Sequence, residues 1–417
     1  KMVQFPQVAQ LDCLPEDGGL NSAIMTQLAG RVAQFHLSVS PAPRDSEWGG
    51  SEHILKTITE NFHHIRDCSH DPKLMARLDG IEHWSRRQLE TLTPLVEERK
   101  AGGYVRECHG DMHLRNIALW KNEIILFDCI EFNKGLRFID VISEIGFLIM
   151  DLEARKKYRL AMRFLNAYME ITGDFAGLMM LRLYKVYRAL VRAKVDILRT
   201  DQEQHGSTEY VQTMAEFYRY LELAESYICP TSPLLVISHG LSGTGKSAGT
   251  RGLADRIGGI QLRSDVERKR LFGDDTTNGI KTGPGKNMYS LEVTIKTYRR
   301  LAELAGSLLA AGYSVIIDAT NLKSEQRRLF EDVARLLAVR FHIVSFTASV
   351  ETLRSRVEKR LQLGSDISDA SVAVLEHQLA SAEPLSADEQ QLTLEVNTER
   401  LLDMDSIARH IASTADR

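Results

Sequence analysis

Hydrophobic residues recur with two different periods along the chain, and the change of period divides it into two parts. Up to about residue 228 apolar positions fall mostly at three- and four-residue steps, as in the stretch 23–35, which predicts helices with one buried face. From residue 234 onward, short apolar runs alternate with helical patterns, which is typical of a doubly wound parallel sheet. The short polar segment 229–233 contains two prolines and suits a linker between domains. We therefore predict an α/β protein with a mainly helical domain, 1–228, followed by a parallel-sheet domain, 234–417.

The first apolar run of the second part, which begins at Leu234, leads into a glycine-rich turn and then a helix-compatible segment. The turn matches the phosphate-binding pattern G-x-x-x-x-G-K-[ST] in its required setting of strand, loop and helix. Glycines let the backbone fold around a polyphosphate so that successive N–H groups point inward, and the helix start adds partial positive charge. A turn with a surface lysine is the alternative. We expect ATP on the loop residues Gly240, Ser242, Gly243, Thr244, Gly245, Lys246 and Ser247, with the Ser247 hydroxyl on Mg²⁺.

Further runs predict strands at 259–262, 314–318, 341–346 and 392–396, and two of them end in carboxylates. Asp265 follows one of these runs and Asp318 closes another. Because ligands of such sheets lie outside the carboxyl ends of the strands, both acids should lie beside the glycine-rich loop. The alternative for Asp265 is a helix N-cap.

This arrangement resembles P-loop kinases of small metabolites, polynucleotide 5′-hydroxyls and zeta-type toxins (the AAA_33 type), over roughly residues 232–400. The resemblance implies that Asp265 takes the proton of an acceptor hydroxyl, that Arg268 holds acceptor or phosphate, and that Asp318 acts on Mg²⁺ through water. It also implies that Thr320 and Asn321 face the acceptor. A lid helix at 351–363 would bring Arg356 and Arg360 to the transferring phosphate, and the glycine-rich stretch 273–288 would cover the acceptor; exposed charged or turn-rich surface is the alternative for both.

A second set of candidate residues lies in the first part, in H-G-D-M-H-L-R-N at 109–116 and F-D-C-I-E at 127–131. An aspartate five residues before an asparagine, with another aspartate on the next strand, suits phosphoryl transfer, because one carboxylate can accept a hydroxyl proton while the others hold Mg²⁺. The stretch resembles aminoglycoside phosphotransferases and choline kinases. That resemblance makes Asp111 the catalytic base, Asn116 and Asp128 metal ligands, His109 a packing residue, and Asp140 a brace of the loop.

Kinases of that group clamp ATP between two lobes, and the first lobe supplies a glycine-rich cover and a strand lysine. Residues 1–108 contain no G-x-G-x-x-G and no lysine in a strand setting, and the chain begins at Lys1. We therefore expect this chain to carry only the C-terminal lobe of such a kinase. Catalysis is accordingly assigned to the P-loop domain.

Composition and charge narrow the function further. The net charge of −4 over 417 residues gives no overall attraction to nucleic acid or to anionic membranes. The five scattered cysteines, which lack C-x-x-C spacing, argue against a disulfide framework and against a zinc site, and they fit a reducing cytoplasm. No apolar run is long enough for a membrane span, and no signal peptide is present.

The sequence thus predicts a cytoplasmic, ATP- and Mg²⁺-dependent phosphotransferase that acts on a hydroxyl of a small molecule. Three alternatives remain open. The P-loop domain could be an ATPase that switches its neighbour, and the first domain could be a binding module that captures the acceptor. The protein could also be a polynucleotide 5′-hydroxyl kinase, which the near-neutral charge and the lack of clustered aromatic residues disfavour.

Overall fold

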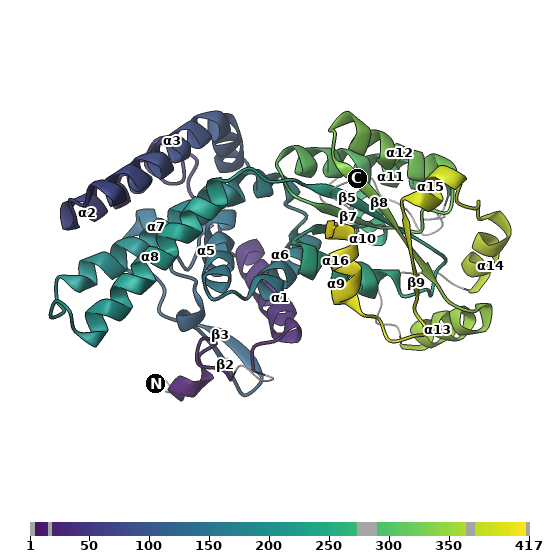
Figure 1. Ribbon diagram of the computed structural model, residues 1–417, viewed down its shortest axis with the longest axis horizontal. Coiled ribbons are helices and arrows are strands. Elements are labelled where there is room, and N and C mark those ends of the chain that lie inside the picture. Colours follow the sequence, from purple (N-terminus) through teal and green to yellow (C-terminus); the bar gives the residue numbers. More distant parts are fainter. Residues whose placement is uncertain (1–4, 16–18, 273–289, 364–371, 414–417) are drawn as a thin grey trace. The chain divides into compact units, whose positions relative to one another are not determined.

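A boundary between Pro230 and Thr231 divides the computed structural model into two units (Figure 1). The structure describes residues 5–15, 19–272, 290–363 and 372–413. Unit 1 comprises residues 1–230 and unit 2 residues 231–417. The predicted acceptor cover at 273–288 and most of the segment after the predicted lid helix lie outside the described residues.

Unit 1 is mainly helical, as the hydrophobic periodicity predicted. Asn21 and Asp71 cap two of its helices, since each side chain accepts hydrogen bonds from first-turn N–H groups. In the centre α7 packs against α2, α5 and α8, while α1 packs against α6. The longer helices are α1 (Ser22–Ser38), α2 (Ser51–Cys68), α3 (Pro72–Ala101), α5 (Val141–Ala154), α6 (Tyr158–Thr172), α7 (Leu178–Thr200) and α8 (Thr208–Ile228).

Two short antiparallel strand pairs interrupt these helices. β1 (Val105–Glu107) pairs with β4 (Phe138–Asp140), and β2 (Ile117–Trp120) pairs with β3 (Glu123–Leu126). Lys121 and Asn122 form the turn between β2 and β3, and both adopt positive φ, 51° and 64°, as a two-residue hairpin requires. The single helical turn α4 (Lys134–Arg137) follows β3. The segment between β1 and β2 carries residues 109–116, and β3 leads to Asp128.

Unit 2 contains the parallel sheet that the alternating pattern predicted. Its strand order is β6-β7-β5-β8-β9, and every neighbouring pair is parallel. The central strand β5 reads as a continuous apolar run because helices cover both of its faces. The strands are β5 (Leu234–His239), β6 (Ile260–Arg263), β7 (Val315–Asp318), β8 (Arg340–Thr347) and β9 (Thr393–Asn397).

Helices lie on both faces of this sheet (Figure 1). α9 contacts β5, β6 and β7 on one face and also packs on α16, whereas α11 and α12 contact β5 from the other face. The unit is therefore doubly wound. The helices are α9 (Lys246–Ile257), α10 (Ser264–Phe272), α11 (Leu291–Ala310), α12 (Ser324–Leu336), α13 (Val350–Leu363), α14 (Val372–Ser381), α15 (Ala387–Gln391) and α16 (Met404–Ser413).

Close contact between α9 and the sheet depends on Gly249. A Cβ atom at this position would lie 2.3 Å from the ring of Phe346, which is itself buried in β8. Such a distance requires Phe346 or the helix to shift. This close contact fixes the distance between α9 and the sheet, and with it the position of the start of α9 relative to the strand ends.

We predict that Gly249→Ala destabilises unit 2 although alanine favours helices. Overpacking against Phe346 costs about 1–3 kcal/mol, more than the gain of about 0.5–1 kcal/mol that replacing a helical glycine brings. Gly252→Ala is the matched control in the same helix, because its Cβ would lie an ordinary 3.5 Å from Met404. This control should be stabilised by up to about 1 kcal/mol.

Urea unfolding followed by circular dichroism measures both changes. Tryptophan fluorescence supplies an internal reference, since the three tryptophans, Trp48, Trp84 and Trp120, all lie in unit 1. The fluorescence transition should be unchanged in both variants. Equal stability of the two alanine variants would show that α9 does not approach Phe346 this closely.

Candidate functional site

The carboxyl ends of β5, β6 and β7 open into one cavity of unit 2. Parallel strands end at the same edge of a sheet, so the loops that follow them meet there. The cavity has a volume of about 660 Å³. Its lining includes the glycine-rich loop after β5, the start of α10 after β6, the segment 318–320 after β7, and side chains of α11, α12, α13 and α14. The predicted edge site is thus a single hollow.

The glycine-rich loop after β5 forms one wall of this cavity. Gly240 has φ 140°, and a Cβ there would lie 2.4 Å from the Phe346 carbonyl oxygen, so only glycine fits. α9 begins at Lys246, and its N-cap residue Gly245 supplies no side-chain hydrogen bond. The first N–H groups of α9 are therefore not capped by a side chain at this position, which is the arrangement that suits an anion.

Lys246 is buried at the mouth of the loop. Its ammonium donates to the Leu241 carbonyl oxygen at 2.7 Å and contacts the Thr244 hydroxyl at 3.4 Å. The pKa of Lys246 is lowered to about 8, mainly by burial and in part by the charge of Arg360, while Asp318 and Asp265 act in the opposite direction. The ammonium is thus held by a backbone carbonyl of the loop that surrounds it.

Ser247 and Asp318 both line the cavity and contact each other. The Ser247 hydroxyl hydrogen-bonds the Asp318 carboxylate, and Arg263 Nε lies 3.3 Å from Asp318 Oδ2. Burial raises the pKa of Asp318, whereas Arg263, the Ser247 hydrogen bond and Lys246 oppose that rise. A hydroxyl and a carboxylate are hard oxygen ligands of the kind that Mg²⁺ takes together with phosphate oxygens. The two residues predicted to hold the metal therefore fit it.

Asp265 and Arg268 lie on the first turns of α10, and both line the cavity. Arg268 Nη1 lies 3.2 Å from Asp265 Oδ1, and the side chains are 9% and 27% exposed, respectively. α10 begins at Ser264, so Asp265 lies inside the first turn and not before it. Its carboxylate is therefore available on the cavity side with one guanidinium beside it.

The predicted lid arginines reach the same cavity from α13. Arg356 donates to the Gly243 carbonyl oxygen at 3.3 Å and to the Thr398 hydroxyl at 2.9 Å. Arg360 also lines the cavity. Arg354, on the same helix, is exposed and pairs with Glu376 of α14 at 2.8 Å. Two of the three arginines of α13 thus face the phosphate loop.

The sequence-based placement of Asn321 was wrong, while Thr320 lines the cavity as expected. Asn321 is fully buried, and its amide donates to the Ser238 carbonyl oxygen at 2.6 Å. It therefore links β5 to the segment after β7. Its φ of 49° is tolerated because asparagine adopts the left-handed region more easily than most residues.

Helix α14 contributes cavity residues that the sequence did not reveal. The Gln378 carboxamide oxygen accepts the backbone N–H of Ser242, in the phosphate loop, at 2.9 Å. Leu375 is buried against Leu353 and Val357 of α13, with Leu241 of the loop packed on the same cluster. No motif marks Gln378, because a glutamine in a helix carries no spacing signal; only the fold brings it to the loop.

In unit 1 the structure brings Asp111 and Asn116 together. The Asn116 amide donates to the Asp111 backbone oxygen and to its Oδ2, each at 3.0 Å. His113 Nε2 lies 3.3 Å from the same carboxylate. Burial alone would raise the pKa of Asp111, but His113, Arg188 and Arg192 outweigh it and hold the pKa below its ordinary value. Asp111 is therefore ionised at neutral pH.

Asp128 lies at the end of β3 and is exposed, with φ 62°. A backbone hydrogen bond from Phe127 N to Asn116 O (3.1 Å) joins the segments that carry Asn116 and Asp128. His109 Nε2 lies 2.7 Å from the Phe127 carbonyl oxygen. Because a carbonyl oxygen only accepts hydrogen bonds, the ring nitrogen is the donor. These contacts join the loop 109–116 to the end of β3.

The residue that holds this loop from behind is Glu144, which the sequence analysis did not identify. Its carboxylate accepts the backbone N–H of His109 at 2.6 Å and of Gly110 at 3.1 Å. Asp140, expected to brace the loop, instead caps α5 and forms a buried pair with Arg99 at 2.7 Å. Arg99 also pairs with Asp174 at 2.7 Å.

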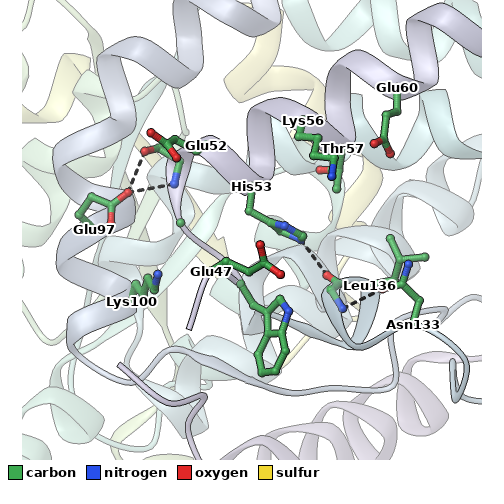
Figure 2. A pocket seen from close by; sticks show the side chains of 14 residues that line it. Glu47, Glu52, His53, Lys56, Thr57, Glu60, Glu97, Lys100, Asn133 and Leu136 are labelled. Carbon is green, nitrogen blue, oxygen red and sulfur yellow. Dashed lines mark hydrogen bonds between the residues drawn. The ribbon is translucent and has the colours of Figure 1, made fainter. Parts of the chain in front are cut away.

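A second cavity of about 640 Å³ lies in unit 1, between α2, α3 and the segment around Gly135 (Figure 2). Figure 2 shows Glu97 bonded to the start of α2 and His53 bonded to the Gly135 carbonyl oxygen, at 3.0 Å. The neighbouring Leu136 also borders the loop, since a Cβ on Gly110 would lie 2.8 Å from the Leu136 carbonyl oxygen. One segment thus separates this cavity from residues 109–111.

Comparison with known families supports the interpretation of unit 2. Residues 235–385 match the AAA_33 family, described as an AAA domain. This match confirms the predicted P-loop kinase domain at the level of the family. The resemblance of unit 1 to aminoglycoside phosphotransferases stays a prediction.

Two mycobacterial proteins match most of the chain. The uncharacterized protein Rv2004c of Mycobacterium tuberculosis is 30% identical over 368 residues, which cover 87% of this chain and 70% of that protein. The uncharacterized protein Mb2027c of Mycobacterium bovis matches with the same identity and coverage. The similarity therefore extends across both units.

Solved structures give weaker likenesses. The APS kinase CysC of Mycobacterium tuberculosis, solved with AMPPNP and APS, has a TM-score of 0.32 and 20% identity, and the match covers 45% of this chain and 100% of that one. A gluconokinase from Sinorhizobium meliloti has a TM-score of 0.32 and 19% identity, with 45% and 95% covered. We draw no conclusion from likenesses at these scores.

Within the described residues, no helix is both long and apolar enough to cross a bilayer.

The low pKa of Lys246 predicts how nucleotide affinity depends on pH. Below about pH 8 the ammonium is charged and available to phosphate, and above it the empty loop loses this charge. Binding of a polyphosphate must then take up a proton, so the Kd of a fluorescent ADP analogue should rise by up to about tenfold per pH unit above pH 8. Lys246→Met, which cannot titrate, should bind weakly with a Kd that does not change over that range. The same slope in both proteins would exclude Lys246 as its source.

The contact of Gln378 with the loop predicts a charge effect on binding. Gln378→Glu keeps the shape of the side chain but places a negative charge beside the Ser242 N–H, so we expect the affinity for ADP to fall about tenfold or more. Gln390→Glu is the matched control, because Gln390 is exposed in α15 and outside the cavity. Unchanged binding by Gln378→Glu would mean that α14 does not lie over the loop in solution.

Proposed function

The chain belongs to the same family as the Mycobacterium tuberculosis protein Rv2004c, and we propose that it is an ATP-dependent phosphotransferase that moves the γ-phosphate of ATP to a hydroxyl of a small molecule. One observation carries this proposal. A single cavity of unit 2 holds the phosphate loop, the Ser247–Asp318 pair and the carboxylate of Asp265. Phosphoryl transfer needs these three parts close together. The alternative, a turn with a surface lysine, would not explain why the Ser247–Asp318 pair and Asp265 lie in the same cavity.

Each cavity residue has a role in this proposal. Ser247 and Asp318 would hold Mg²⁺, which neutralises charge on the phosphates when bound. The loop amides and Lys246 bind the β- and γ-phosphates, and Arg268 orients the acceptor. Asp265 takes the proton of the acceptor hydroxyl as its oxygen bonds to the γ-phosphorus and the bond to the β-phosphate oxygen breaks, so that ADP leaves.

The arginines of α13 supply charge stabilisation. Arg356 is already anchored on the loop through the Gly243 carbonyl oxygen, and Arg360 lies one helical turn further along the same face. Guanidinium groups at this place stabilise the negative charge on the phosphoryl oxygens during transfer. Arg356 and Lys246 donate to backbone oxygens of the loop, and they would exchange these partners for phosphate oxygens when nucleotide binds.

Unit 1 is a second candidate site, and the contact of Asn116 with Asp111 favours it. In this reading unit 1 is the C-terminal lobe of an aminoglycoside phosphotransferase-like kinase, Asp111 is the base, and Asn116 and Asp128 would bind Mg²⁺. The alternative is a module that binds the acceptor, with the cavity of Figure 2 as its pocket. A variant of Asp111 separates the two units as sites of transfer.

The test is transfer of radiolabelled γ-phosphate to panels of sugars, aminoglycosides, nucleosides and 5′-hydroxyl oligonucleotides. We expect labelled product with a small-molecule hydroxyl, and a loss of at least about a hundredfold in Lys246→Ala and in Asp265→Asn, because each removes a group that acts on the reacting atoms. Arg354→Ala is the control, since Arg354 is exposed and outside the cavity. It should keep wild-type transfer.

Other outcomes would redirect the proposal. Transfer that survives Lys246→Ala and is lost in Asp111→Asn would place the reaction in unit 1. ATP hydrolysis that no acceptor accelerates would favour a nucleotide-driven switch. Salt-sensitive labelling of oligonucleotides alone would identify a polynucleotide kinase.

A further inference from the structure

Three ligand-bearing side chains meet in the interior of unit 1, behind the loop that carries residues 109–116. His36 lies near the end of α1, Cys108 follows β1, and Glu144 lies in the first turns of α5. Their ligand atoms all lie within 4.8 Å of one another, and among the described residues no other group of three such side chains comes as close. Each is almost completely buried, with exposures of 3%, 2% and 0%.

One ring nitrogen of His36 has no hydrogen-bond partner. Its Nδ1 lies 2.8 Å from the Tyr168 hydroxyl, whereas Nε2 is buried and has no hydrogen bond. Burial and the charge of Arg106 lower the pKa of His36 to about 3, so the ring is neutral at physiological pH. A neutral imidazole that is fixed through one nitrogen and free at the other is the form that binds metals.

Cys108 and Glu144 bring two potential negative charges to the same place. Burial raises the pKa of both side chains, and the Glu144 carboxylate raises that of Cys108 further. The Glu144 carboxylate accepts the N–H groups of His109 and Gly110, which orient it and leave acceptor capacity on its oxygens. One thiolate and one carboxylate would balance the charge of a divalent cation.

We propose that His36 Nε2, Cys108 Sγ and the Glu144 carboxylate bind one Zn²⁺ ion. Nitrogen, sulfur and oxygen ligands together suit zinc, which takes them at about 2.0–2.3 Å in tetrahedral geometry. The three side chains fill three positions, and a water molecule would fill the fourth. Atoms at those distances lie about 3.3–3.8 Å apart, so the side chains draw in by about 1 Å on binding. The thiol loses its proton to solvent as the zinc–sulfur bond forms, and no electron transfer is involved.

The position of this cluster gives the metal a structural consequence. Glu144 holds the backbone of His109 and Gly110, immediately before Asp111. The ion would therefore tie α1, the end of β1 and α5 to the loop that carries Asp111. The sequence analysis argued against a zinc site because the cysteines lack C-x-x-C spacing. That pattern does not detect a site with one cysteine whose three ligands lie far apart in sequence. This inference is independent of phosphoryl transfer.

The test measures metal in the purified full-length chain. We expect about one zinc per chain by elemental analysis after dialysis against metal-free buffer, and less than about a tenth of that in Cys108→Ser and in His36→Gln. Cys68→Ser is the control, because Cys68 lies at the end of α2 outside the cluster. This variant should keep its zinc.

A second measurement does not depend on whether the variants fold. Cobalt added to the metal-free wild-type chain should give the thiolate-to-cobalt charge-transfer absorption and the visible bands of a tetrahedral site, and zinc should abolish them. Zinc binding should also release about one proton near neutral pH, detected with an indicator dye. Wild-type protein that holds no zinc and gives no cobalt bands would overturn the proposal. Zinc retained in both folded cluster variants would overturn it as well.

Discussion

The site of unit 2 depends on parallel pairing within one sheet. β5 pairs with β7 and β8, and β6 pairs with β7, so that Arg263 of β6 lies opposite Asp318 of β7 at the end of the ladder. Register decides this contact: a slip of one residue would turn Asp318 to the opposite face of the sheet. The glycine-rich loop begins at the same edge because β5 ends there. Lys246, Ser247, Asp265 and Asp318 meet for this one reason, although 72 residues separate the first from the last.

Burial makes this edge sensitive to the charge of its ligand. Lys246 and Asp318 are both buried. Burial lowers the pKa of Lys246 and raises that of Asp318, so it favours the neutral form of each side chain. The cations near the loop use backbone carbonyls as partners, Leu241 for Lys246 and Gly243 for Arg356. An anion in the cavity would replace these weak partners with full negative charges, which raises the pKa of the lysine and keeps it protonated.

Local features of this fold could be predicted and long-range ones could not. The strands, the phosphate loop and the positions of Asp265 and Asp318 follow from short patterns, because glycine conformations and strand ends are set within a few residues. Gln378 and Glu144 escaped prediction because their partners, Ser242 and His109, are remote in sequence. Asn321 was misplaced for a related reason: its position after a strand end suggested the cavity, but a carbonyl of the neighbouring strand satisfies its amide inside the core.

In unit 1 the loop that carries Asp111 is held by buried charged side chains. Glu144 accepts the amides that precede Asp111, and Arg188 donates to the Gly110 carbonyl oxygen at 3.1 Å. Both side chains are buried, so each must be hydrogen-bonded, and the loop backbone supplies the partners. Loss of either group would leave the other charge with fewer partners in the interior. The conformation of the loop that carries Asp111 is therefore fixed by buried side chains in the core of unit 1.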